Sequence, residues 1–408
     1  MESDFGIGDK YDALLPKVSK MEASLECPVN LWTIEETNSQ LAYLTHGFFR
    51  YYGKFPSSLA SQLIKQFPAP ENGILIDNFS GSGTSLVEAS RRGIRSIGID
   101  VNPLAVLAGR VKTKRYNIDK LITDKNAIIT YFKQEAKANK TNIPSAIYLD
   151  KWFFDETVKD IERLKDTLLE LRNIESDFFV LAFFSILRRI SKAYDGEVRP
   201  HVNKKKKARD VLSTYIKKVD EMISASKELK ETYSYSINAT TLLTDNRLPY
   251  KSKLPEGNYW LAISHPPYLN CFDYIPVYKL ELSWSLGFEW LWDGVMFKDV
   301  SKQELKSWPA KENVVESYYE GLAQGYRNLY DIQPKGGILA VVIGDCTING
   351  IIERVHQKLI TIIQEIGYSI IELNYRTTYY TTGKYSYQDR ANYHGDDEKK
   401  DAIIIFKK

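Results

Sequence analysis

The segment that most constrains the fold combines two apolar runs with a helix between them. The run 73–79 has the length of a buried strand and ends in a glycine-rich turn. The segment 84–93 has helical spacing, and Gly93 suits the left-handed position that closes a helix. A second apolar run follows at 96–100. Strand, helix and strand in this order predict a parallel sheet covered by helices.

Helices are predicted before and after this unit. The segment 57–67 has helical spacing, with Ser57 or Ser58 as its N-cap. From 104 to 235 no comparable strand run occurs, and three long helices are predicted instead. These helices cover 158–173, 177–194 and 208–229. A helical region between strands is therefore expected.

The strand pattern resumes in the last part of the chain. Runs typical of strands occur at 259–264 and 336–345. Two later runs, 366–375 and 401–408, are candidates for antiparallel strands. We divide the chain into four parts: an N-terminal, partly helical arm (1–40), a first sheet-forming half (41–115), a helical insertion (116–235) and a second sheet-forming half (236–408).

The glycine-rich turn after the first strand is a candidate ligand site. Asp77 precedes the turn, and Gly81 and Gly83 let the backbone approach a ligand closely. No Lys-Ser/Thr pair follows these glycines, which argues against a P-loop. Asp100 ends the next strand, where a carboxylate can accept hydrogen bonds from both hydroxyls of a ribose. The glycines alone would fit a structural turn, but with Asp100 in register they favour a nucleoside cofactor.

A second candidate site is the tetrapeptide His265-Pro266-Pro267-Tyr268, directly after the run 259–264. Two prolines fix their φ angles and remove two backbone donors, so this segment is rigid. A rigid carbonyl beside a polar side chain can hold an amino group from two directions. Tyr268 offers a flat face for a ring. The alternative is a plain turn that ends the strand.

Together, the two sites resemble the amino-group DNA methyltransferases, which make N4-methylcytosine or N6-methyladenine. The segment Asp77–Thr84 is similar to the family's cofactor motif, an acidic residue followed by Phe-x-Gly-x-Gly. His265–Tyr268 is similar to its catalytic Asp/Asn/Ser-Pro-Pro-Tyr motif. Tyr52–Pro56 resembles the segment that touches the methionine part of the cofactor, and Asp245 lies where the family places an acidic contact near the adenine.

The resemblance covers 41–112 and 236–408, and leaves the helical insertion outside it. It implies a doubly wound α/β fold with a mostly parallel, seven-stranded, Rossmann-like methyltransferase sheet. It implies S-adenosyl-L-methionine as the cofactor and no metal. The cofactor-binding residues would be Lys54, Phe55, Pro56, Asp77, Phe79, Gly81, Gly83, Thr84, Asp100, Asn102 and Asp245.

The resemblance also implies a reaction on a base that is rotated out of the duplex. Tyr268 would stack on this base, while the Pro266 carbonyl and the His265 side chain would hold its amino nitrogen. The substrate would be double-stranded DNA with a short specific sequence, in a restriction–modification or defence system with a cognate endonuclease. Between the two products, N4-methylcytosine is slightly favoured.

The main departure from the family is His265, where Asp, Asn or Ser is usual. A neutral imidazole can accept a hydrogen bond, whereas a protonated one cannot. Two alternatives therefore stay open beside a DNA methyltransferase. One is an RNA base methyltransferase, and the other is a catalytically silent nucleic-acid-binding subunit.

A basic segment inside the helical insertion is the candidate for target recognition. The net charge of +3 alone does not indicate nucleic-acid binding, but positive residues gather between 188 and 218. The alternatives are a solvated loop, a helical cap or a dimerisation element. The candidate nucleic-acid-binding residues are Arg188, Arg189, Lys204, Lys205, Lys206, Lys207 and Arg209.

Two further groups are candidates for nucleic-acid contacts. Tyrosines and basic residues alternate between 375 and 393, which suits stacking on bases or a tyrosine-rich strand pair. Phe272 and Tyr274 either line the base pocket, which is slightly favoured, or begin a helix. No apolar stretch is long enough to span a membrane, and the three cysteines lie too far apart to suggest a disulfide framework. A reducing cytoplasm is the expected location.

Overall fold

A computed structural model of the chain describes residues 10–21, 27–35, 37, 39–134, 148–171, 174–233, 237–378 and 399–408. Its centre is a nine-stranded mixed sheet. The strands, in sheet order, are β1 (Lys17–Lys20), β2 (Val29–Thr33), β10 (Ser369–Thr378), β11 (Lys399–Lys407), β7 (Ile338–Gly344), β6 (Asn258–Ser264), β3 (Gly73–Asp77), β4 (Arg95–Asp100) and β5 (Thr240–Leu243). A separate hairpin consists of β8 (Cys346–Ile348) and β9 (Ile351–Glu353).

The sheet is mostly parallel in its centre and antiparallel where the late strands join. β3 pairs in parallel with β4 and with β6, and β6 pairs in parallel with β7. β11 runs antiparallel to both β7 and β10, which confirms the antiparallel arrangement expected of the late strands. Since the chain leaves β3 toward β4 on one side and later places β6 on the other, the strand order reverses beside β3. Doubly wound folds bind ligands at such a reversal.

Helices account for most of the remaining described chain. They are α1 (Ser57–Gln66), α2 (Thr84–Ser90), α3 (Pro103–Thr113), α4 (Ile118–Gln134), α5 (Leu149–Trp152), α6 (Asp155–Glu170), α7 (Ser176–Ile190), α8 (Val211–Thr232), α9 (Tyr274–Val277), α10 (Lys279–Ser285), α11 (Phe297–Gln303), α12 (Glu312–Ile332) and α13 (Val355–Ile366). Short 3-10 helices cover Asp12–Leu14, Gln40–Ala42, Leu44–Gly47, Lys251–Lys253 and Glu289–Leu291. The predicted helices over 57–67, 158–173, 177–194 and 208–229 correspond to α1, α6, α7 and α8.

Both faces of the sheet are covered, because alternate residues of each strand point to opposite sides. Ile74 and Ile76 of β3 belong to a core shared with α12 and α13. Leu75, between them, belongs to a second core shared with α1 and α2. Central strands that are buried on both faces read as continuous apolar runs, which is why β3, β6 and β7 could be predicted from sequence.

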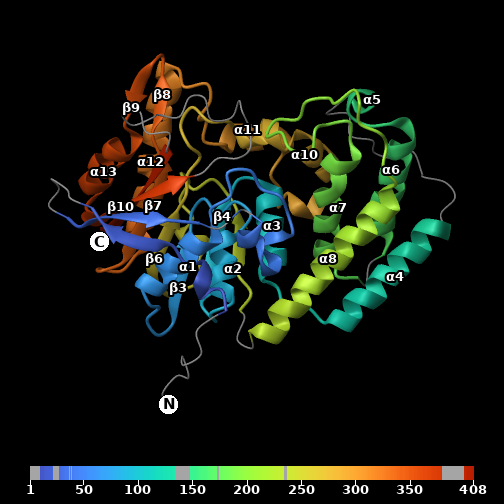
Figure 1. Cartoon of the computed structure of the whole chain (residues 1–408), viewed down its shortest axis with the longest axis horizontal. Helices are drawn as coiled ribbons and strands as arrows, with labels where there is room; N and C mark the ends of the chain where they lie inside the picture. Colours follow the sequence, from blue (N-terminus) through green and yellow to red (C-terminus); the bar gives the residue numbers. More distant parts are fainter. Residues whose placement is uncertain are drawn as a thin grey trace.

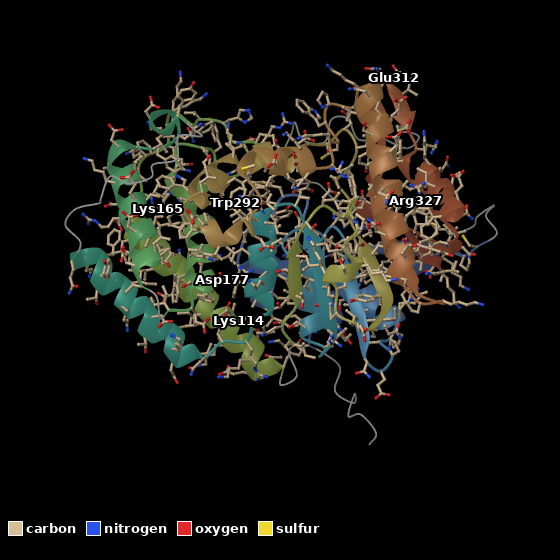
Figure 2. All side chains as sticks on the ribbon, turned by 180° about the vertical axis from the view of Figure 1, so that it is seen from behind. Lys114, Lys165, Asp177, Trp292, Glu312 and Arg327 are labelled. Carbon is tan, nitrogen blue, oxygen red and sulfur yellow. The ribbon has the colours of Figure 1, made fainter. Side chains whose placement is uncertain are left out.

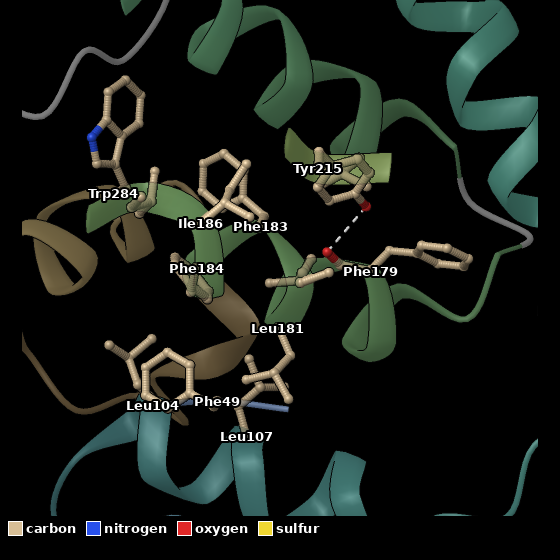
Figure 3. Packing of buried hydrophobic residues seen from close by; sticks show 14 of the residues in the cluster. Phe49, Leu104, Leu107, Phe179, Leu181, Phe183, Phe184, Ile186, Tyr215 and Trp284 are labelled. Carbon is tan, nitrogen blue, oxygen red and sulfur yellow. Dashed lines mark hydrogen bonds between the residues drawn. The ribbon is translucent and has the colours of Figure 1, made fainter. Parts of the chain in front are cut away.

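The helices α4 to α8 lie beyond the β4 side of the sheet (Figure 1), and seen from behind they occupy the opposite end from α12 (Figure 2). Their aromatic-rich core, in which the Tyr215 hydroxyl donates to the Phe179 carbonyl at 3.2 Å, is shown in Figure 3. This core also takes Leu104 from α3 and Trp284 from α10. The helical part therefore packs continuously against elements on both sides of it in sequence. Its identity as an insertion with boundaries at 116 and 235 stays a prediction.

The predicted count of seven strands is wrong, because the segment 1–40 contributes two more. β2 pairs in parallel with β10 and buries Val29 and Trp32. β1 pairs only with β2 and exposes all four of its residues, so it carries no apolar periodicity that sequence reasoning could detect. The N-cap of α1 is Pro56 rather than Ser57, whose hydroxyl instead donates to the Leu41 carbonyl at 2.8 Å.

No helix within the described ranges is long and apolar enough to cross a membrane.

Candidate active site

A pocket lies at the carboxyl ends of β3, β4, β5 and β6. Its empty volume is about 840 Å³, including open solvent at its mouth. The segment 51–55 and the start of α9 close its sides. The residues that line it are Tyr51, Gly53, Lys54, Phe55, Asp77, Asn78, Phe79, Ser80, Gly81, Ser82, Thr84, Asp100, Val101, Asn102, Thr244, Asp245, Asn246, His265, Pro267, Tyr274, Ile275, Gln303, Glu304 and Leu305.

The glycine-rich turn between β3 and α2 forms the floor of the pocket. Gly81 and Gly83 have φ angles of 48° and 78°, the left-handed region in which glycine carries no steric penalty. A Cβ on Gly83 would lie 2.7 Å from the Cα of Gly109, so the turn also packs tightly on α3. The buried Lys112 supports the turn from below, because its Nζ donates to the Ser82 carbonyl at 2.8 Å.

Two carboxylates face each other across this turn. Asp100 accepts from the backbone N–H of Gly81 at 2.9 Å and of Asn102 at 2.8 Å. Asp77 accepts from the Phe79 N–H at 3.1 Å and from the Ser85 hydroxyl. Burial raises the pKa of Asp77 to about 7 and that of Asp100 to about 6, against these hydrogen bonds, which lower both. Asp100 therefore holds the turn closed and presents a carboxylate to the pocket.

The polar groups of the pocket fit a nucleoside cofactor. Within the described part of the chain, the buried side-chain amide of Asn78 and the hydroxyl of Ser82 have no hydrogen-bond partner. Buried polar groups normally have partners, so these two call for a polar ligand or water in the pocket. Glycines that admit a ligand, a carboxylate on the strand end and unpartnered amide atoms are the groups that a ribose and its base would need.

The segment 51–55 supplies a cation and aromatic rings to the same pocket. Lys54 donates to the His46 carbonyl at 3.0 Å, and burial lowers its pKa to about 8. The ring of Phe55 lies 5.3 Å from the ring of His265. Tyr51 stacks on Tyr274 with ring centroids 5.5 Å apart.

The tetrapeptide after β6 reaches the pocket through His265 and Pro267. The Nε2 atom of His265 lies 3.3 Å from the Tyr268 hydroxyl. The Pro267 carbonyl accepts from the buried Tyr318 hydroxyl at 2.7 Å, whereas the Pro266 carbonyl accepts no hydrogen bond from the described residues. The Pro266 carbonyl thus lies in a rigid segment next to His265, although Pro266 itself is not among the residues that line the pocket.

Tyr268 itself is held in the core and does not line the pocket. Its side chain is 7% exposed, and its ring packs so closely on Gly344 that a Cβ there would lie 2.9 Å from it. Behind it, Arg376 forms a buried ion pair with Asp401. Burial opposes the charge of Arg376, but attraction to Asp401 and Tyr268 outweighs it, so the pKa of Arg376 is raised. Tyr268 is therefore tied both to His265 and to this ion pair.

Four of the expected cofactor residues have structural roles. Asp245 lines the pocket, but its carboxylate is engaged by Arg247, with an Nη2–Oδ2 distance of 2.6 Å. Asn102 caps α3 by accepting from the Leu104 N–H at 3.0 Å. Gly83 and Pro56 are not among the residues that line the pocket. Gly83 shapes the turn, and Pro56 is the N-cap of α1.

Sequence reasoning missed Glu304, which lies opposite the turn. It accepts from the Ile275 N–H at 2.9 Å and from Lys306 at 2.9 Å, and burial raises its pKa. It belongs to no motif and to no periodic segment, so no local signal could have identified it. Tyr274 does line the pocket, as favoured, and it also begins α9. Phe272, also favoured, is buried beside Tyr274 without lining the pocket.

The comparisons with known proteins agree with this geometry. Residues 9–108 match a protein family described as DNA methylase, which includes the segment 51–55 and the glycine-rich turn. The chain is 30% identical over 211 residues to the Type II methyltransferase M.MvaI of Kocuria varians, covering 47% of this chain and 43% of that protein.

The chain is thus similar to amino-group DNA methyltransferases over part of its length. It is also 26% identical over 270 residues to the Type II methyltransferase M.BsoBI of Geobacillus stearothermophilus, covering 59% of this chain and 52% of that protein. The chain thus spans about half the length of these relatives. Among solved structures it is similar to the rRNA methyltransferase aviRa of Streptomyces viridochromogenes, at 11% identity and a TM-score of 0.38, covering 91% of this chain and 94% of that one.

The structure corrects two of the expected DNA contacts. Arg188 is buried, and it donates to the carbonyls of Glu197 and Val198 at 2.8 and 2.9 Å. Lys206 is likewise turned inward, with its Nζ 2.6 Å from the Ala193 carbonyl. Both side chains hold the loop after α7 in place, because a buried cation needs acceptors. They are not available to a phosphate.

The other five candidate nucleic-acid-binding residues are exposed: Arg189, Lys204, Lys205, Lys207 and Arg209. Arg209 pairs with Asp195 at 3.2 Å. In the late aromatic and basic group, Tyr375 and Arg376 lie on β10, and residues 379–393 lie outside the described residues.

Proposed function

We propose that this protein transfers a methyl group from S-adenosylmethionine to the exocyclic amino group of a base in DNA. The observation that carries the proposal is that two motifs far apart in sequence meet in one pocket. The glycine-rich turn with Asp100 and the tetrapeptide with His265 both line it. A cofactor site and an acceptor for an amino group are therefore adjacent.

The turn, the strand ends and the segment 51–55 would hold the cofactor. Asp100 would accept the ribose hydroxyls, the unpartnered amide of Asn78 would meet the nucleoside, and Lys54 would face the carboxylate of the methionine part. The cofactor, once bound, supplies an electrophilic methyl group. No metal takes part in this arrangement.

His265 and the Pro266 carbonyl would bind and orient the amino group of the extruded base. A carbonyl accepts one N–H of the amino group and a neutral imidazole accepts the other. Two acceptors fix the direction of the nitrogen lone pair, and such orientation can supply several kcal/mol of the barrier to transfer. The buried ring of Tyr268 would support His265 and would meet the base only at its exposed edge.

For the target we propose cytosine N4, in double-stranded DNA with a short specific sequence and within a restriction–modification system with a cognate endonuclease. The match to a DNA methylase family and the similarity to Type II methyltransferases support a DNA substrate. The choice of cytosine N4 over adenine N6 follows only the slight preference stated from the sequence. The exposed lysines after α7 would lie along the DNA backbone.

The test is methyl transfer from labelled cofactor to unmethylated bacterial DNA and, in parallel, to structured RNA. Label in DNA supports the proposal. Label in RNA alone would replace it with an RNA methyltransferase. No label in either, with the cofactor shown to bind by calorimetry, would replace it with a silent binding subunit.

A further inference from the structure

An arginine and a tryptophan stack where the helical part meets the loop that follows the tetrapeptide. The guanidinium carbon of Arg199 lies 3.8 Å from the ring centroid of Trp308. Trp308 is 38% exposed and Arg199 is partly buried, so the pair lies at the surface. A cation–π pair at an exposed site contributes only about 0.5 to 1 kcal/mol to stability.

Trp308 is fixed to the loop that carries the tetrapeptide. The backbone N–H groups of Ser307 and Trp308 donate to the Asp273 carboxylate at 3.0 and 3.3 Å. The Asn270 N–H donates to the Ser307 carbonyl at 2.7 Å, and the Asn270 side chain accepts from the Ala310 N–H at 3.1 Å. Residues 270 and 273 follow Tyr268 directly, so the indole is held at a set position relative to His265.

Arg199 is fixed to the other side of the pocket. The loop before it is held by Arg188, which donates to the carbonyls of Glu197 and Val198. The Tyr52 hydroxyl donates to the Glu197 carbonyl at 2.8 Å, and Tyr52 precedes the pocket residues Gly53 and Lys54. The buried Arg188 thus fixes the loop that carries Arg199. This positioning role gives a reason for a buried cation at position 188.

The guanidinium of Arg199 is poised to bind an anion. It makes no hydrogen bond or ion pair with any residue that the structure describes. Stacking on an indole occupies one flat face and leaves the donors at the edge directed outward, in the fork that matches phosphate oxygens. The exposed Lys204, Lys205 and Lys207 follow on the same loop and add positive charge of the sign that DNA requires.

We propose that Arg199, held flat on Trp308, binds a backbone phosphate of the DNA strand beside the extruded base. This inference rests on the proposed function, since it takes DNA as the substrate. In this proposal the stacked pair of Arg199 and Trp308 positions the DNA strand. The exposed lysines that follow Arg199 in the loop add positive charge without a fixed geometry. A phosphate contact sets register and orientation and carries no sequence information.

The test compares DNA binding by the full chain and its variants over a series of salt concentrations. Arg199→Ala should lower the slope of log K against log salt by about 0.9, the value for one lost phosphate contact. The loss should be equal on cognate and unrelated duplexes. Arg199→Lys should not restore the affinity, because a lysine cannot reproduce the stacked, two-pronged contact. Trp308→Ala should weaken binding while the charge is retained.

Arg327→Ala is the matched control, because Arg327 is an exposed arginine on α12, far from the helical part in Figure 2. It should leave the slope unchanged, and all variants should keep the cofactor affinity of the wild type. An unchanged slope for Arg199→Ala, in a wild type that methylates DNA, would overturn the phosphate site alone. A lowered slope in a wild type that methylates no DNA would keep the phosphate site and overturn the proposed function. A wild type that does not bind DNA would overturn both.

Discussion

The Nε2 atom of His265 lies 3.3 Å from the hydroxyl oxygen of Tyr268, so the tetrapeptide that we propose to be catalytic contains an internal contact. This contact involves the residue in which the tetrapeptide departs from the motif that it resembles. A neutral His265 donates through one ring nitrogen and accepts through the other, whereas a protonated His265 cannot accept. The proposed role requires the neutral state. Tyr268 is in turn held by the buried pair of Arg376 and Asp401.

Replacement of His265 by Ala should reduce methyl transfer about 100-fold and leave the cofactor dissociation constant almost unchanged. The reason is that His265 orients the amino group, and a misplaced reactant costs about this factor. Single-turnover transfer and calorimetric cofactor titration measure the two quantities. Tyr268→Phe, which keeps the ring and removes only the hydroxyl, should give a smaller loss of transfer. Equal losses of transfer and cofactor binding in His265→Ala would show that the residue serves the pocket as a whole.

Cofactor affinity should have two pH limits. Burial raises the pKa of Asp100 to about 6, so below this pH the carboxyl is protonated and no longer accepts two ribose hydroxyls. Burial lowers the pKa of Lys54 to about 8, so above this pH the amine is neutral and no longer attracts a carboxylate. Titration without DNA between pH 5 and about 9 should therefore give highest affinity between these limits. Lys54→Met should lack the alkaline limit and keep the acid one; a wild-type affinity that is flat over this range would rule out both roles.

Asp100→Asn should stabilise the cofactor-free protein while it weakens cofactor binding. The pKa of Asp100 is raised in the folded state, so its contribution to stability is full below the unfolded pKa and is lost as the pH rises through about 6. At pH 7 the wild type therefore carries a cost of about 3 kcal/mol that an amide would avoid. Urea unfolding at pH 7 and at pH 4 measures it. The variant should be more stable than the wild type at pH 7, and this difference should be larger at pH 7 than at pH 4. A variant that is less stable than the wild type at pH 7 would indicate that the hydrogen bonds from Gly81 and Asn102 to the carboxylate dominate.

Removing only Arg376 from its ion pair with Asp401 should destabilise the protein strongly. Replacing both residues by apolar ones should destabilise it much less. Arg376→Leu leaves Asp401, which is fully buried, without its cation, and should cost about 3 to 5 kcal/mol of unfolding free energy. A double variant with Asp401→Leu should recover much of this loss, because the buried charge is gone. Urea unfolding of the single and double variants measures the difference. If both lose stability equally, the pair does not act as a buried charge pair.

The parts of the fold that could be predicted are those in which pattern and burial coincide. β3, α2 and β4 are buried, regular and separated by glycines, so their residues identified both the elements and the pocket beside them. β1 could not be predicted, because an exposed, four-residue edge strand gains its structure from the pairing with β2. β5 is also a four-residue edge strand, in which only Leu243 is buried, and it was missed for the same reason.

In the site, the motif residues gave the positions of His265 and Asp100, since turns and strand ends place them directly. Glu304 and Tyr51 reach the pocket only through tertiary packing, for which no local pattern exists. Arg188 was misplaced because a cation in a basic segment has the same sequence signature whether it faces solvent or the interior. Its burial depends on carbonyls at 197 and 198 that only the folded loop presents.

The most direct test of the account is nucleoside analysis of unmethylated bacterial duplex DNA after incubation with the protein and labelled S-adenosylmethionine. The account predicts label in N4-methylcytosine and its loss in His265→Ala. Label in N6-methyladenine would correct the target base and keep the reaction. No label in any nucleoside of DNA, from a protein shown to bind the cofactor, would contradict the central claim that the pocket and the tetrapeptide together methylate DNA.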